Sequence, residues 1–148
     1  MTLQRLCLLL AALWAGVLLA IGALAAPAAF AVAPTDVAGR IAGRLFRQEA
    51  YAALALSMLL FMMLRRVARD RAERGLGSVF SGEMLLALAA LFMTVAGYFA
   101  LQPLMEAARA GQGRWSFGAL HGASAIAFGL KGLVVLGLAW RLSRPQTS

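Results

Sequence analysis

The chain has 148 residues, of which 62% are hydrophobic and only 14% are charged. Because roughly a quarter of the residues of a soluble domain are charged, this composition excludes an ordinary soluble protein and predicts one membrane domain over residues 1–148. The net charge of +8 does not predict nucleic-acid binding, since all thirteen arginines lie outside the apolar stretches and no basic surface with aromatic residues is available for base stacking.

The first apolar segment runs from Leu6 to Thr35 without a charged side chain. A bilayer is crossed by about 20 apolar residues, whereas the apolar core of a signal peptide has about 7–15. We therefore predict a retained transmembrane helix over about 6–30, loosened by Pro27 and ended by Pro34. Small residues recur every four positions and predict a close-packing face, made of Ala12, Gly16 and Ala20.

The second helix is expected to start at Thr35 as its N-cap, with Asp36 in the first turn. The next residues predict an amphipathic lead-in over about 36–45 at the membrane surface, followed by a span over about 45–64. Three arginines fall on one face of the lead-in because they are spaced three and four residues apart; they are Arg40, Arg44 and Arg47. A solvated face at the membrane surface is sufficient to explain them.

The segment from Arg65 to Gly82 predicts a hydrophilic loop, because it holds five arginines and its glycines mark a turn. A third span is predicted over about 83–104, broken by Pro103, and a fourth over about 117–140. The predicted fold class is therefore all-α: a polytopic membrane protein with a bundle of four transmembrane helices.

Four spans place both termini on the same side of the membrane. Eight of the thirteen arginines fall on that side and five on the other. The excess of basic residues in cytoplasmic loops predicts that both termini are cytoplasmic. The abundance of alanine, leucine and arginine suggests a GC-rich bacterial genome, so we expect the bacterial inner membrane.

Ionisable side chains inside membrane spans are costly and are candidates for function. The second and fourth spans start at the outer face and the third ends there, which places Glu49, Gln102 and His121 at similar depths. We predict that these residues, with Gln48, form a polar cluster in the outer leaflet. Two roles are open for it: sharing a proton or binding a divalent metal ion, or joining the helices through hydrogen bonds.

Lys131 is a separate intramembrane charge, about 13 Å along the helix from Trp140 and near the bilayer centre. No acidic residue is expected at its depth, where Ser57 and Thr94 are the nearest polar residues. A lone lysine there costs about 2.5–3.5 kcal/mol. Three explanations stay open: the side chain reaches toward the membrane interface, it loses its proton, or it faces another subunit. A stripe of small residues on the same helix predicts tight packing, and comprises Gly118, Gly122, Ala125, Gly129 and Gly132.

The sequence contains no HExxH, P-loop, GxSxG or CxxC motif, and it has one cysteine, Cys7, and one histidine. We therefore predict no catalytic residues, no cofactor and no defined metal site. Thioethers such as those of Met58 and Met62 suit Cu(I), but flexible packing is the commoner use of methionine.

Several segments together resemble one family: AGRIAGRLF (38–46), Tyr51, Gln102-Pro103, Arg114 and Leu120-His121-Gly122-x-Ser124. The chain is similar along most of its length to the bacterial four-helix membrane protein family of unknown function related to eukaryotic transmembrane protein 205 (domain of unknown function 4149). The resemblance implies a four-span fold and a membrane location, and it gives His121 no role. Phe128 departs from the family, in which an asparagine is common there, so a polar network using that asparagine is not expected here.

These observations predict an integral inner-membrane protein with a structural or accessory role. Its expected partners are the lipid bilayer and a second copy or another membrane protein, with no nucleic acid. The alternative is the handling of a small solute, a proton or a metal ion through the outer-leaflet cluster, as a weaker likeness to copper-resistance-D-type proteins implies.

Overall fold

The computed structural model describes residues 2–144, and every regular element within that range is helical. These elements join into four continuous rods, each long and apolar enough to cross a membrane. The rods are Leu3–Val32, Thr35–Glu73, Gly82–Arg109 and Phe117–Ser143. The predicted all-α class with four membrane-spanning helices is therefore confirmed.

The first and third rods each contain a π-helical segment. The first consists of α1 (Leu3–Leu19), η1 (Ala20–Ala25) and α2 (Ala26–Val32). The third consists of α4 (Gly82–Thr94), η2 (Val95–Ala100) and α5 (Leu101–Arg109). The second and fourth rods are single helices, α3 (Thr35–Glu73) and α6 (Phe117–Ser143).

Each π-helical segment ends just before a proline, and this corrects the prediction that Pro103 breaks the third helix. Pro27 follows the end of η1 by two residues and Pro103 follows the end of η2 by three. Proline has no N–H for the carbonyl four residues back, and its ring clashes with that carbonyl. A wider turn lets the rod continue: the N–H of Ala26, for example, donates to the Ile21 carbonyl five residues back.

The second rod begins where predicted, within one residue, and is longer than predicted at its C-terminal end. α3 is one helix of 39 residues that includes both the lead-in and the basic segment up to Glu73, so the turn is confined to residues 74–81. Arginine and alanine are good helix formers, and buried Ala68 gives the extension a contact with the core. Thr35 is the first helical residue rather than the N-cap, which is Pro34 and makes no side-chain cap bond.

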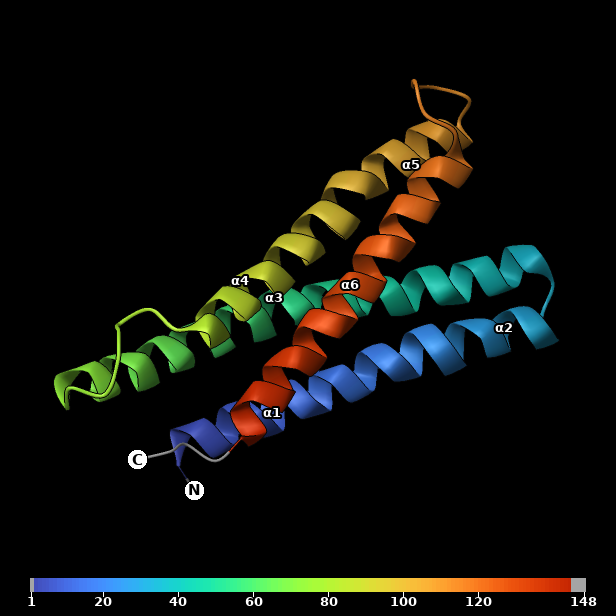
Figure 1. Ribbon diagram of the computed structural model, residues 1–148. Helices are drawn as coiled ribbons and strands as arrows, with labels where there is room; N and C mark the ends of the chain where they lie inside the picture. Colours follow the sequence, from blue (N-terminus) through green and yellow to red (C-terminus); the bar gives the residue numbers. More distant parts are fainter. Residues whose placement is uncertain (1, 145–148) are drawn as a thin grey trace.

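The four rods form two hairpins that meet at one end and diverge at the other (Figure 1). The hairpin of α2 and the start of α3 points one way, and the hairpin of α5 and the start of α6 points another. α2 contacts only η1 and α3, and α5 contacts only η2 and α6, within residues 2–144. We call the end where α3 and α6 begin the open end, and the opposite one the closed end.

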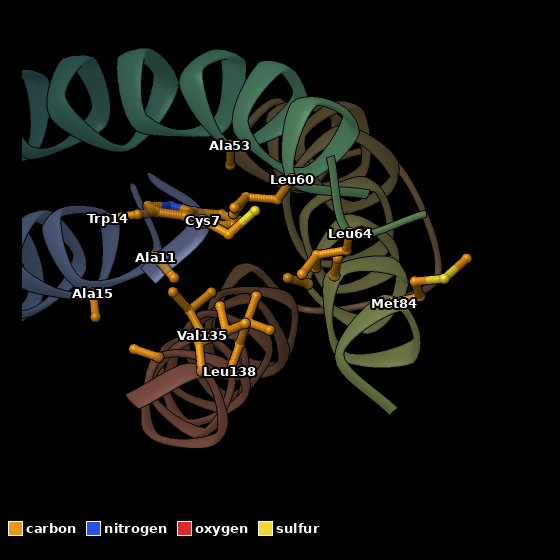
Figure 2. Close-up of a cluster of buried hydrophobic side chains, with 14 of the residues drawn as sticks. Cys7, Ala11, Trp14, Ala15, Ala53, Leu60, Leu64, Met84, Val135 and Leu138 are labelled. Atoms are coloured by element: carbon orange, nitrogen blue, oxygen red, sulfur yellow. The ribbon is translucent and has the colours of Figure 1, made fainter. Parts of the chain in front are cut away.

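The closed end holds the hydrophobic core, in which side chains from α1, α3, α4 and α6 meet (Figure 2). Leu60 and Leu138 are its largest fully buried side chains. The face of α1 that packs here consists of Cys7, Ala11, Trp14, Ala15 and Leu18. The predicted small-residue face is wrong, because Ala12, Gly16 and Ala20 are all exposed.

A close helix approach joins η2 to α6. A Cβ added at Gly97 would lie 2.4 Å from the Cβ of Ala127, so only glycine fits there. The Ser124 hydroxyl donates to the Gly97 carbonyl across the same contact, at 2.7 Å. Ser124 of the Leu120-His121-Gly122-x-Ser124 segment therefore ties α6 to the π-helical segment.

Replacing Gly97 with alanine is expected to lower the free energy of unfolding by about 1–3 kcal/mol, because the new methyl group overlaps Ala127. Thermal unfolding in detergent micelles measures the change. Gly137→Ala is the control, since an added Cβ at Gly137 meets nothing within 4 Å; it should be neutral or slightly stabilising. Equal effects of the two substitutions would contradict the close contact.

Candidate functional site

A deep groove separates the two hairpins at the open end. Its volume is about 1230 Å³, and apolar side chains and glycines make up most of its walls. One wall comes from the end of α1, η1, α2 and the first half of α3, and the other from the end of α4, η2, α5 and α6. Figure 1 shows the two hairpins diverging at this end.

A buried ion pair lies in the groove. The Lys131 ammonium donates to Glu49 Oε2 at 2.6 Å, and the two side chains are only 3% and 2% exposed. The other carboxylate oxygen, Oε1, accepts a hydrogen bond at 3.3 Å from the indole N–H of Trp14. The Glu49 carboxylate is thus shared by three rods, α1, α3 and α6, and we call Trp14, Glu49 and Lys131 the ion-pair site.

The ion pair joins two helices whose backbones do not meet: within residues 2–144, no Cα atoms of α3 and α6 lie within 8 Å. Aromatic rings reinforce this bridge. Phe46 of α3 meets Phe128 of α6 edge to face, with centroids 5.0 Å apart, and the Lys131 ammonium lies 5.0 Å from the Phe128 ring. A Cβ at Gly22 would lie 2.9 Å from Phe128, so η1 also packs against this ring.

The rim of the groove at the open end carries charged groups. Arg40 pairs with Asp36 one helical turn away, at 3.0 Å and largely exposed. Arg109, the last residue of α5, lies over the Phe117 ring at 4.4 Å. Phe117 in turn stacks on the His121 ring, with centroids 5.6 Å apart.

The structure does not bring the four residues of the predicted polar cluster into contact, and Gln48 is exposed. Glu49 and His121 both line the groove, but Glu49 pairs with Lys131, whereas His121 stacks on Phe117 at the rim. Gln102 donates to Glu106 on its own helix at 3.5 Å. The three arginines of the predicted basic face, Arg40, Arg44 and Arg47, are all exposed.

The prediction that no acidic residue lies at the depth of Lys131 is wrong. A second span that begins at Leu45 places Glu49 only four residues inside the membrane. The helix α3 begins at Thr35, so Glu49 lies farther from the helix start than that prediction assumes. Glu49 follows Thr35 by fourteen residues, and Lys131 follows Phe117, the start of α6, by the same number. Measured from the starts of their own helices, Glu49 and Lys131 therefore lie at the same depth. Ser57 and Thr94 instead donate to carbonyls of their own helices.

The predicted tight packing of the small-residue stripe on α6 is also wrong. An added Cβ at any glycine of that stripe meets nothing within 4 Å. Three of its members line the groove: Ala125, Gly129 and Gly132. The stripe therefore widens the groove rather than joining two helices.

No group of three or more His, Cys, Asp or Glu side chains in residues 2–144 is arranged to hold a metal ion. The ammonium of Lys131 occupies the place beside Glu49 that a cation would take. A molecule that enters the groove would therefore meet the exposed arginines Arg40 and Arg109 at the rim and the buried Glu49–Lys131 pair farther in.

The four rods and the groove between them define a small multi-pass membrane protein. The chain belongs to the family described as domain of unknown function (DUF4149), whose model matches residues 9–114. That range includes Trp14 and Glu49 and stops before α6, so Lys131 and the Leu120-His121-Gly122-x-Ser124 segment lie outside it. No curated protein and no solved structure matches the chain.

Proposed function

We propose that the protein is an accessory membrane protein that binds a lipid-like amphipathic molecule in its groove. The observation that carries the proposal is the groove itself, about 1230 Å³ and lined mainly by apolar groups, with a buried ion pair inside it. Small-molecule pockets usually measure about 300–1,000 Å³. A larger apolar space between membrane-spanning rods suits a molecule supplied by the bilayer.

The ion-pair site supports a binding role. Burying two charges costs several kcal/mol per ion before their attraction is counted, and apolar residues of similar volume often serve stability equally well. Charged side chains in membrane spans are for this reason suspected of function. Here the pair lines the inner part of the groove, where most of the surrounding groups are apolar.

The proposed setting follows from charge and composition. We propose the bacterial inner membrane with both termini in the cytoplasm, supported by the excess of arginines on the terminal side. The groove then opens in the outer leaflet. The role is one of binding rather than catalysis or nucleic-acid recognition, and contact with a second copy or another membrane protein belongs to the same proposal.

Replacing Gly129 with phenylalanine tests the groove. Gly129 lines it and an added Cβ meets nothing within 4 Å, so a phenyl ring can enter the groove without disturbing a helix contact. We expect the amount of lipid retained by the purified protein to fall at least about tenfold, equal to about 1.4 kcal/mol of binding. Native mass spectrometry of protein released from detergent micelles measures retention.

Gly118→Phe is the matched control. Gly118 lies on the same helix, has the same open surroundings and does not line the groove. Retention should match wild type in this variant. If Gly129→Phe folds and retains as much lipid as Gly118→Phe, the groove is not a binding site.

A further inference from the structure

We propose that the groove selects an anionic diacyl lipid, whose head group binds at Arg109 and whose acyl chains lie along α6. This inference rests on the proposed function and adds the class of ligand. It depends on two observations, the charge balance of the groove and the distance from its rim to the Phe46–Phe128 pair.

The charge balance leaves one cation without an anionic partner. Five side chains that line the groove carry a formal charge: Asp36, Arg40, Glu49, Arg109 and Lys131. Asp36 neutralises Arg40 and Glu49 neutralises Lys131. Arg109 has no carboxylate within 4 Å among residues 2–144, and its described contact is the Phe117 ring.

Arg109 is suited to a phosphate group. Guanidinium presents five N–H donors in a planar fork that matches phosphate oxygens, and stacking on an aromatic ring restrains its position. The ring of Phe117 is itself supported by His121, whose imidazole lies at the same rim. An anionic head group at this point would be bound without breaking either of the two ion pairs.

The part of the groove between its rim and the Phe46–Phe128 pair matches the depth of one leaflet. Phe117 at the rim and Phe128 beside the ion-pair site are eleven residues apart on α6, about 17 Å at 1.5 Å per residue. Half of a ~30 Å hydrocarbon core is about 15 Å. A lipid with its head group at Arg109 therefore extends its acyl chains past Ala125 to the Phe46–Phe128 pair, next to Gly129.

The test is competition between two lipids with identical acyl chains, phosphatidylglycerol and zwitterionic phosphatidylcholine, added in equal amounts to the delipidated protein in detergent. Wild type is expected to retain phosphatidylglycerol about tenfold over phosphatidylcholine, and salt at about 1 M should reduce this ratio. Arg109→Gln should bring the ratio close to one, while Arg109→Lys, which keeps the charge and loses the planar fork, should keep only part of the preference.

Arg144→Gln is the matched control, because Arg144 also lies over an aromatic ring, that of Trp140, and sits at the closed end. It removes the same charge and should leave the ratio unchanged. A wild-type ratio near one, or equal losses in Arg109→Gln and Arg144→Gln, would overturn the inference while leaving the groove as a lipid site. Retention of both lipids in Gly129→Phe would instead overturn the proposed function.

Discussion

Lys131→Met is expected to lower the free energy of unfolding by about 3–5 kcal/mol. The substitution keeps much of the side-chain volume but leaves the Glu49 carboxylate, only 2% exposed, without its cation. The indole of Trp14 would be the remaining donor to that carboxylate. Unfolding with denaturant in mixed micelles, followed by circular dichroism at 222 nm, measures the loss.

The double variant Glu49→Gln/Lys131→Met should recover most of that loss, because it removes both charges together. Arg141→Met is a matched control at the pair between Arg141 and Glu83, where Arg141 is 53% exposed. Exposed pairs contribute about 0–1 kcal/mol, so its effect should be small. A double variant as unstable as Lys131→Met would show that packing, and not charge, sets the cost.

Trp14→Ala is expected to destabilise the protein by about 3–5 kcal/mol. The indole is 2% exposed, it packs in the core of the closed end, and it donates to Glu49. Removing it creates a cavity where three rods meet and takes one hydrogen bond from the carboxylate. The same micelle unfolding experiment measures the effect.

Two further variants separate the causes. Trp14→Phe keeps most of the ring and removes the N–H, so a loss of about 1–3 kcal/mol would be due mainly to the carboxylate. Trp140→Ala, at a residue 65% exposed, should change stability by less than about 0.5 kcal/mol. A loss in Trp140→Ala equal to that in Trp14→Ala would contradict the assignment of Trp14 to the core.

The number of spans and the helical class could be predicted from the sequence, because apolar length alone decides which segments cross a bilayer. The ends of the helices could be predicted less well. The second helix was predicted to end before Arg65, where the charged segment begins. Because arginine favours helix, α3 continues to Glu73. Pro103 was expected to end the third span, but the π-helical segment before it accommodates the missing N–H.

The candidate site was predicted only in part. Glu49, His121 and Lys131 stood out as ionisable residues in apolar segments, and all three line the groove. Their partners did not follow from the sequence, since which faces of two helices meet is a property of the whole bundle. Trp14 was not predicted as a site residue because a tryptophan in an apolar helix is ordinary. Arg109 was not predicted either, because it falls between the spans predicted over about 83–104 and 117–140.

The small-residue stripe of α6 shows the same limit in another form. Glycine and alanine at intervals of three and four predict a helix contact when a neighbouring helix is present. In this fold the neighbouring hairpin diverges, so the same residues line an open space. The sequence pattern identifies a smooth surface, and the topology decides what lies against it.

The 39 residues of α3 have a consequence for how the protein sits in the bilayer. At 1.5 Å per residue the helix is about 58 Å long, whereas a membrane with its head-group layers measures about 40–45 Å. An upright α3 must project into water, and a tilted one must shift its neighbours with it. The arginines from Arg65 to Arg71 lie near one end of α3 and those from Arg40 to Arg47 near the other. Hydrophobic matching is therefore confined to the portion between Arg47 and Arg65, whose only charged residue is Glu49. A membrane thicker or thinner than this portion is therefore expected to change the tilt of α3, and the helices packed against α3 would move with it.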